Sequence, residues 1–459
     1  MKMQLGEIAR VTGANNDIEQ WATIEVTSVA FDARQLNAGA LFVPLAGARN
    51  GHDFVEQAFT NGAVATFWAS DHADQPTDFP VLVVSDPLEA YQQLAMHYLQ
   101  KINPKVVAIT GSNGKTTTKD MTAAVLGSQY NIHKTQANFN NEIGVPQTIL
   151  SMEANTEILV VEMGMDRPGQ LTALSELTMP DVAVITMIGE AHIEFFKTRA
   201  KIADAKMEIT DGLKEDGLLI YAGDEPLLNE RIGPLTTATF GSSTTNDLYP
   251  LQVRAGETKT EFKLNAWPEI TFTIPMMGTY NVNNALAAIL VGQQFHIKPE
   301  LMKKALAHFE VTRNRTEWLM GQTGARMLSD VYNSNPTAAK EVLHNFSHFE
   351  TDGRRIAVLG DMLELGTASK KLHESLAQEL DPTVIQEVFL YGDEIKPLYF
   401  SLQGRYEPEH LHYFNRYEQA ELINSLQAMI QPADLIVLKA SHGLHLENVV
   451  AALQAIEAN

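Results

Sequence analysis

The 459-residue chain contains no cysteine. It can therefore form no disulfide, no thiol nucleophile and no cysteine-ligated zinc or iron–sulfur site. It also lacks an uninterrupted apolar run of the ~18 residues that a membrane span needs. Its first residues, Met1 to Glu7, have no apolar segment typical of a signal peptide. We therefore expect a cytoplasmic protein without membrane insertion.

Positive charge is scarce. The chain has 34 Lys and Arg against 56 Asp and Glu, a formal net charge of −22 at pH 7. A surface this acidic repels nucleic-acid phosphates and anionic lipids, so we expect no nucleic-acid partner. Any phosphate-bearing ligand must then be held by local groups, namely backbone amides, lysines or divalent metal ions.

The order of apolar segments predicts an α/β protein with three domains, which agrees with a prior of about 150 residues per domain. We place a small N-terminal α/β domain at 1–103 and a central P-loop ATPase-like domain with a parallel sheet at 104–311. A C-terminal Rossmann-like α/β domain follows at 312–459. In the central region, continuous apolar runs predict parallel strands buried on both faces. The predicted strands are Val26–Val29, Ala40–Val43, Ala63–Ala69, Val81–Val84, Val106–Thr110, Ile158–Glu162, Val182–Ile185, Leu218–Tyr221, Met327–Val331, Ile356–Leu359, Val388–Tyr391 and Leu435–Lys439.

Helical patterns separate these strands, and short alternating segments at 239–275 predict an antiparallel extension. The predicted helices are Leu88–Ile102, Thr117–Leu126, Gln170–Leu177, Ala200–Leu213, Val282–Gln294 and Glu300–Phe309.

The sharpest local signal is a glycine-rich loop between a predicted strand and a predicted helix. It consists of Gly111, Ser112, Asn113, Gly114, Lys115, Thr116 and Thr117. The glycines let the backbone curl so that its amides face phosphate oxygens, and the helix N-terminus adds partial positive charge. Lys115 can reach the β- and γ-phosphates of a nucleotide, and the Thr116 hydroxyl can ligate Mg²⁺. The loop therefore predicts ATP binding.

Polar residues at the ends of other strands have two interpretations each. Glu162 ends a strand where ligands of open α/β sheets bind, so it could hold Mg²⁺ or simply be a capping or solvated acid. His192 follows the next strand and could be a metal ligand or a surface histidine. Lys206 lies in a helical stretch and, on composition, is a solvated residue. Asn140 and Asn141 could position a substrate or form a turn, and Asp330 could contact a nucleotide or cap a helix.

Taken in order along the chain, these motifs resemble those of the Mur ligase family, the ATP-dependent amide-forming enzymes of peptidoglycan precursor synthesis. The matching segments are Thr110-Gly-Ser-Asn-Gly-Lys-Thr-Thr, Asn140-Asn-Glu-Ile-Gly-Val-Pro, Glu162-Met-Gly, Glu190-Ala-His, Ala205-Lys-Met-Glu-Ile, Gly278-Thr-Tyr-Asn-Val-Asn-Asn-Ala, Arg313-Asn-Arg-Thr-Glu and Asp330-Val-Tyr-Asn-Ser-Asn-Pro. The resemblance implies the three-domain Mur ligase architecture and a monomeric enzyme that uses ATP and Mg²⁺.

Within this family the chain is similar to the branch that adds D-alanyl-D-alanine to UDP-N-acetylmuramoyl-tripeptide. The segments Leu359-Gly-Asp-Met-Leu-Glu-Leu-Gly366 and Gly47-Ala-Arg-Asn-Gly-His-Asp-Phe54 fit that branch, and the Asp-Asn-Pro-Arg segment of the diamino-acid-adding relatives is missing.

The resemblance also implies residue roles. Lys115 would hold the ATP phosphates, and Thr116 and Glu162 would ligate one Mg²⁺. His192 and Lys206, the latter as a carbamate, would serve a second. Asn284 and Asp330 would contact adenine or ribose, and Arg315 the phosphates. Ser28, Asp32 and Arg34 would hold the UDP end of the substrate.

Two alternatives stay open on the sequence. Another ligase on the same scaffold, a diamino-acid-adding Mur ligase or a folylpolyglutamate synthase, would share the phosphate loop and the Lys206 motif. A P-loop ATPase switch would share the loop alone, and the motifs outside the loop favour a ligase over it.

Overall fold

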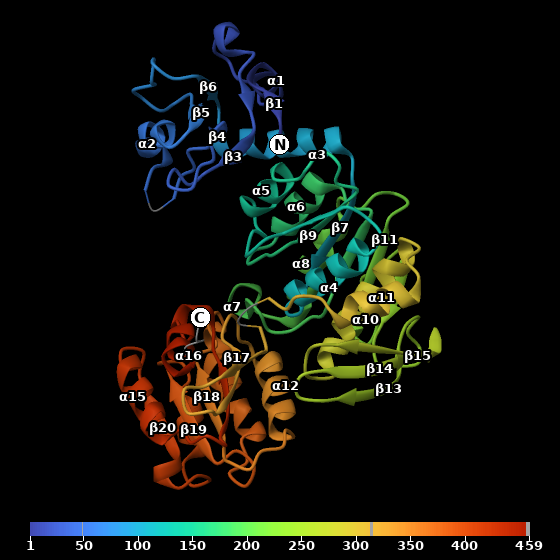
Figure 1. Ribbon diagram of the computed structural model, residues 1–459, viewed down its shortest axis with the longest axis vertical. Coiled ribbons are helices and arrows are strands. Elements are labelled where there is room, and N and C mark those ends of the chain that lie inside the picture. Colours follow the sequence, from blue (N-terminus) through green and yellow to red (C-terminus); the bar gives the residue numbers. More distant parts are fainter. Residues whose placement is uncertain (48, 313–314, 456–459) are drawn as a thin grey trace. The chain divides into compact units, whose positions relative to one another are not determined.

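The computed structural model describes residues 1–47, 49–312 and 315–455 (Figure 1). This part of the chain divides into two compact units, each built from separate stretches of sequence. The first comprises Met1–Thr110, Gln129–Val184 and Glu208–Leu219, and the second comprises Gly111–Ser128, Ile185–Met207 and the described residues from Ile220 onward. The three predicted regions each contain a parallel sheet, as the predicted α/β class requires, and their boundaries at 103/104 and 311/312 stay a prediction.

The first unit contains a four-stranded parallel sheet of order β3-β4-β5-β6. Its strands are Ser28–Ala30, Ala40–Phe42, Ala63–Ala69 and Val81–Val84. Helix α3 (Pro87–Ile102) follows, and Asp86 caps it because its carboxylate accepts hydrogen bonds from the amides of Leu88 and Glu89 at 2.7 and 3.2 Å.

The predicted strand Val26–Val29 is wrong in one respect, because the chain changes sheets within it. β2 (Glu25–Val26) pairs with β1 (Met3–Gln4), whereas Ser28 already belongs to the parallel sheet as the first residue of β3. Apolar periodicity alone does not register such a switch between two partners.

A six-stranded sheet of order β12-β11-β10-β7-β9-β8 occupies the middle of the sequence. Its strands are β7 (Lys105–Thr110), β8 (Ile132–Lys134), β9 (Ile158–Glu162), β10 (Val182–Ile185), β11 (Leu218–Ala222) and β12 (Thr237–Phe240). β7 and β9 are parallel neighbours and are almost completely buried, which confirms the interpretation of their apolar runs.

Helices and a small sheet complete this region. α4 (Lys115–Gly127) follows the glycine-rich loop and packs against α10 (Tyr280–Gln294) and α11 (Pro299–Ala307). The predicted antiparallel extension is present as β13 (Pro250–Ala255), β14 (Thr260–Leu264) and β15 (Trp267–Ile274).

The predicted helix Ala200–Leu213 is too long. α8 spans Arg199–Met207, and a short 3-10 turn, Glu208–Thr210, follows it. The Ser175 hydroxyl on α6 (Gln170–Thr178) donates to the Ile209 carbonyl and accepts from the Gly212 amide at 3.0 Å. This side chain satisfies backbone groups that a longer helix would have paired internally, so the helix ends early.

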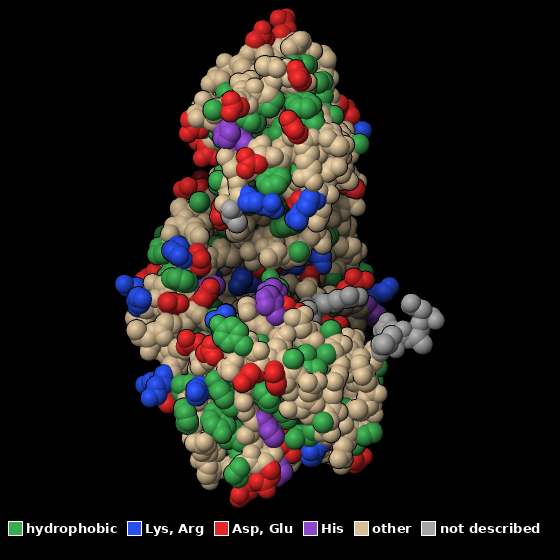
Figure 2. Space-filling model, turned by 90° about the vertical axis from the view of Figure 1, so that its left-hand side faces the viewer, with side chains coloured by type: hydrophobic (Ala, Val, Ile, Leu, Met, Phe, Trp, Pro, Cys, Tyr) green, Lys and Arg blue, Asp and Glu red, His purple; other side chains and the backbone are tan. Residues whose placement is uncertain are grey.

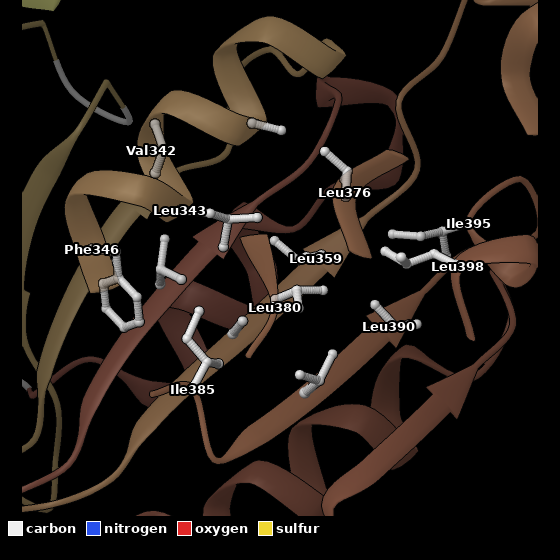
Figure 3. Close-up of a cluster of buried hydrophobic side chains, with 14 of the residues drawn as sticks. Val342, Leu343, Phe346, Leu359, Leu376, Leu380, Ile385, Leu390, Ile395 and Leu398 are labelled. Carbon is white, nitrogen blue, oxygen red and sulfur yellow. The ribbon is translucent and has the colours of Figure 1, made fainter. Parts of the chain in front are cut away.

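The C-terminal region is a sheet of order β16-β17-β21-β18-β19-β20, antiparallel only at its β16 edge. The strands are β16 (Glu317–Met320), β17 (Arg326–Asp330), β18 (Arg355–Gly360), β19 (Glu387–Tyr391), β20 (Leu411–Phe414) and β21 (Leu435–Lys439). Figure 3 shows how one face is closed. Leu343 of α12 (Pro336–Ser347) points toward Leu359 of the sheet, and Val342, Phe346 and Leu390 belong to the same buried cluster.

Acidic side chains are spread over the face seen in Figure 2 rather than gathered in one place, as the net charge leads one to expect. Among the described residues, no helix combines the length and the apolar character that crossing a bilayer requires.

Candidate active site

The predicted strand–loop–helix around the glycine-rich loop is confirmed. β7 leads into Gly111, and α4 begins at Lys115. Gly114 has φ +80°, and a Cβ at this position would lie 2.4 Å from Oδ1 of Asn284. Gly111 has φ +153°, and a Cβ there would overlap Oγ1 of Thr186. Only glycine fits both positions, and the backbone curls as phosphate binding requires.

Side chains from several elements hold the loop in this form. The side-chain amides of Asn113 and Asn335 donate to each other, at 3.2 and 2.7 Å, and Thr186 donates to the Asn113 carbonyl at 2.5 Å. The Ser112 amide donates to the Met187 carbonyl at 3.0 Å. Thr186 was not singled out in the sequence, although a polar residue directly after the apolar run Val182–Ile185 is a usable signal.

The lysine of the loop folds back over it. Nζ of Lys115 donates to the Gly111 carbonyl at 2.8 Å, so the amine lies above the curled backbone. Thr116 is buried, and the Arg315 guanidinium donates to its hydroxyl at 3.4 Å. The same guanidinium lies over the ring of Tyr332, 4.1 Å from its centroid. The cationic side chains of Lys115 and Arg315 thus both lie at the glycine-rich loop, where they could offset the negative charge of a phosphate. Arg313 and Asn314 of the same motif lie outside the described residues.

Asn284 lies directly beneath the loop. Its Oδ1 accepts from the Thr118 hydroxyl at 3.2 Å, and its Nδ2 donates to Oδ1 of Asn281 at 3.0 Å. The amide therefore braces the start of α4 from α10. A nucleotide contact by Asn284 stays a prediction.

Glu162 ends β9 beside Ile109, the second residue before Gly111 of the loop. The carboxylate is only 3% exposed. Oε1 accepts from Nδ2 of Asn140 at 2.9 Å, whereas Oε2 has no hydrogen-bond partner among the described residues. A buried carboxylate oxygen without a partner is costly in a protein interior, and a divalent cation would satisfy it. This orphaned atom fits the predicted metal site.

Lys206 is not the solvated residue that composition suggests. It lies on α8 and is only 2% exposed, so this interpretation of the sequence is wrong. Burying a cationic amine is unfavourable in itself, which distinguishes Lys206 from an ordinary helix-surface lysine. No cluster of three or more His, Asp or Glu side chains suited to a metal ion occurs in the described part of the chain.

His192 follows β10 in a left-handed backbone conformation, with φ +62°. Its Nδ1 is paired with the carboxylate of Glu364, a residue that the sequence placed in a family-like motif without a role. Asp330, the last residue of β17, is paired with the amine of Lys439 at 2.5 Å. Lys439 had no assigned function in the sequence analysis.

The predicted substrate residues fall in the first unit. Arg34 makes two parallel hydrogen bonds to Asp32, at 2.9 and 2.8 Å, and these lower the pKa of Asp32 to about 2. Oγ of Ser28 is buried without a hydrogen-bond partner among the described residues. Asp32 thus stays ionised at any physiological pH, and Ser28 retains an unused polar atom.

The loop with Asn140 and Asn141 lies against the same region. The rings of Phe31 and Phe139 meet edge to face, 6.3 Å between centroids, and Gln147 donates to the Val29 carbonyl at 3.3 Å. Asn141 forms a turn, because its Oδ1 accepts from the Gly144 amide at 2.9 Å. Asn140 instead holds Glu162, so the loop joins the two sets of predicted residues within this unit.

Comparison with known proteins agrees with this geometry. The Mur ligase middle domain matches residues 109–292, and the Mur ligase, glutamate ligase domain matches residues 314–442. The UDP-N-acetylmuramoyl-tripeptide–D-alanyl-D-alanine ligase of Bacillus subtilis is 43% identical over 98% of this chain and 97% of its own length.

Two solved structures are similar over almost the whole chain. MurF from Acinetobacter baumannii is 25% identical with a TM-score of 0.86, covering 98% of each chain. The MurF ligase from Thermotoga maritima, determined in complex with ADP, is 27% identical with a TM-score of 0.80, covering 93% of this chain and 96% of its own. The domain matches, the whole-length identity and the shared fold together establish that this chain belongs to the Mur ligase family.

Proposed function

We propose that this chain is an ATP-dependent ligase that joins D-alanyl-D-alanine to the peptide carboxylate of UDP-N-acetylmuramoyl-tripeptide. The observation that carries the proposal is the 43% identity, over 98% of the chain, to a relative named for that reaction. The glycine-rich loop supports the nucleotide part, because its curled backbone and Lys115 form an anion cradle at the start of a helix.

ATP makes the reaction feasible because a carboxylate is a poor electrophile. Its charge repels nucleophiles, and oxide is not a leaving group at neutral pH. Transfer of the γ-phosphoryl group from ATP to the carboxylate oxygen gives ADP and an acyl phosphate. The free amine of D-alanyl-D-alanine then attacks the carbonyl carbon, loses its proton, and displaces inorganic phosphate to form the amide.

The first step brings several negative charges together. Two like charges 4 Å apart repel by about 4 kcal/mol at an effective dielectric of 20. In the proposed site Lys115, Arg315 and the loop amides hold the phosphates and offset part of this repulsion. These local groups allow a chain of net charge −22 to bind ATP.

Thr116, Glu162, His192 and Lys206 are the residues that would hold Mg²⁺, which supplies further positive charge against the phosphates. The unpartnered Oε2 of Glu162 supports this assignment. Lys206 fits it only as a carbamate, because carbamylation turns a buried cationic amine into an anionic oxygen donor that a hard cation accepts.

Substrate binding is assigned to the first unit. Ser28, Asp32 and Arg34 would hold the UDP end, and Asn140 and Asn141 would position the loop beside it. In the proposal the enzyme acts as a monomer in the cytoplasm.

An acceptor screen tests the proposal. Purified protein is given ATP, Mg²⁺ and UDP-N-acetylmuramoyl-tripeptide, and phosphate release is measured with D-alanyl-D-alanine, lysine, diaminopimelate or glutamate as the amine. We expect release with D-alanyl-D-alanine and negligible release when either substrate is omitted. Release with lysine, diaminopimelate or glutamate would instead identify another ligase on this scaffold. Hydrolysis that needs no amine but responds to a macromolecule would identify an ATPase switch.

A further inference from the structure

Glu364 lies in the loop that follows β18, and two hydrogen bonds join this loop to the turn that carries His192. The Glu364 carboxylate pairs with Nδ1 of His192. Its backbone carbonyl accepts from the Glu194 amide at 2.9 Å. Both loops belong to the second compact unit. The side-chain contact is therefore supported by a main-chain contact two residues away on the His192 side.

The two loops lie close together, and residues in both of them have positive φ angles. Gly366 has φ +53°, and a Cβ on it would come within 3.0 Å of Cγ of Glu194. His192 and Glu364 are both left-handed, with φ +62° and +60°. Non-glycine residues seldom adopt this conformation, and strained backbone of this kind is concentrated at functional sites.

The Glu364 loop is fixed from behind by buried groups. His373 is fully buried, and its Nε2 accepts from the Met362 amide at 3.0 Å. The Leu363 amide donates to the Ser441 hydroxyl at 3.0 Å, and the Ser441 amide donates to the Asp361 carbonyl at 3.0 Å. The three residues before Glu364 are thus each hydrogen-bonded to other parts of the C-terminal region.

We propose that Glu364 is the positioning residue for His192, and that it orients the imidazole so that Nε2 faces the bound divalent cation. A carboxylate on Nδ1 keeps the proton on that nitrogen, which leaves the Nε2 lone pair for a metal ion and makes it a better donor. Nε2 has no hydrogen-bond partner among the described residues. The inference rests on the proposed role of His192 as a metal ligand.

The pair has a consequence for assembly of the site. His192 belongs to the region that matches the Mur ligase middle domain, whereas Glu364 belongs to the region that matches the glutamate ligase domain. The cation site is then complete only while the Glu364 loop contacts the His192 turn. Loss of that contact should therefore lower the affinity for the cation.

The test is Mn²⁺ binding to the full-length protein in the presence of ADP, followed by the electron paramagnetic resonance signal of free Mn²⁺. We expect Glu364→Ala to weaken Mn²⁺ binding by about 10- to 100-fold, the usual effect of removing a residue that orients a metal ligand. Glu364→Gln keeps an acceptor oxygen for Nδ1 but loses the charge, and we expect an intermediate loss. Glu407→Ala, which changes an exposed glutamate of the same region, is the matched control and should bind as the wild type does.

His192→Ala separates the two claims. If His192→Ala weakens Mn²⁺ binding and Glu364→Ala does not, the positioning role is overturned while the metal role of His192 stands. If His192→Ala binds Mn²⁺ as tightly as the wild type, the metal assignment itself fails. Should Glu364→Ala fail to fold, Glu364→Gln decides, and wild-type Mn²⁺ affinity in that variant overturns the inference.

Discussion

Nζ of Lys439, the last residue of β21, lies 2.5 Å from Oδ2 of Asp330, the last residue of β17, and the lysine is only 2% exposed. The two strands are parallel neighbours, with Asp330 directly opposite Lys439. The amine also donates to the Asn333 carbonyl at 2.9 Å. A buried ion pair therefore joins the ends of the neighbouring strands β17 and β21.

Removing the lysine should destabilise the protein strongly. Lys439→Met leaves the Asp330 carboxylate buried without its counter-charge, so we expect a loss of about 3 kcal/mol in the free energy of unfolding. Urea denaturation followed by circular dichroism measures it. Lys259→Met is the control, because Lys259 is 61% exposed and lies 2.7 Å from Glu261, and exposed pairs contribute about 0–1 kcal/mol. Equal losses in the two variants would contradict the buried-pair interpretation.

Lys115→Ala should abolish turnover without unfolding the protein. The side chain lies over the glycine-rich loop and is only partly buried, so its loss removes charge from the phosphate site rather than core packing. We expect phosphate release to fall by at least ~100-fold. Lys105→Ala, at the opposite end of β7 with its amine on Asp181, should keep near wild-type activity. A folded Lys115→Ala enzyme with normal phosphate release would refute the assignment.

Gly114→Ala should impair nucleotide binding and stability together. The new Cβ would collide with Oδ1 of Asn284 and would require a left-handed alanine, at a cost of about 1–3 kcal/mol. Gly13→Ala is the matched control, because Gly13 has φ +64° but no atom within 4 Å of the added Cβ. Urea denaturation and titration with fluorescent ADP measure both effects. Weaker ADP binding in Gly13→Ala than in Gly114→Ala would exclude the steric explanation.

The stability of the protein should fall in acid partly because of His373. Burial lowers the pKa of His373 below its ordinary value of 6.5, because desolvation disfavours the charged ring. The neutral ring accepts a hydrogen bond from the Met362 amide through Nε2. The unfolded chain then binds a proton more readily than the folded one, so this contribution is complete above pH 6.5 and is lost as the pH falls below it.

The comparison of wild type with His373→Gln isolates this contribution, because the other histidines titrate in both proteins. The variant should be less stable near neutral pH, owing to lost packing, but the difference in free energy of unfolding should shrink between about pH 8 and about pH 5. Urea denaturation across that range measures it, and a constant difference would show that His373 does not titrate on unfolding.

Long apolar runs and the glycine-rich loop made much of the fold predictable. The buried strands β7, β9 and β10 match their predictions because parallel strands covered on both faces have continuous apolar sequence. Short edge strands such as β16 and β20 were missed, since strands that are partly exposed lack that pattern.

The sequence predicts a set of candidate site residues, but it does not predict the contacts that these residues make. The burial of Lys206 and the pairing of His192 with Glu364 depend on residues far apart in the sequence. Periodicity describes a residue's own element and contains no information on its partner in another one. The resemblance to a known family suggests roles, which stay predictions, whereas only the structure shows which atoms meet.

Helix α4, whose first residue is Lys115, contacts α10 near both of its ends. Near the start, Oδ1 of Asn284 accepts a hydrogen bond from the Thr118 hydroxyl, and this side chain fills the space beside Gly114. Toward the far end, Gly292 is so close to Val125 that a Cβ would come within 2.7 Å of it. The shape of the anion cradle is therefore already set when the polypeptide folds, and an arriving nucleotide need not spend binding energy on ordering it.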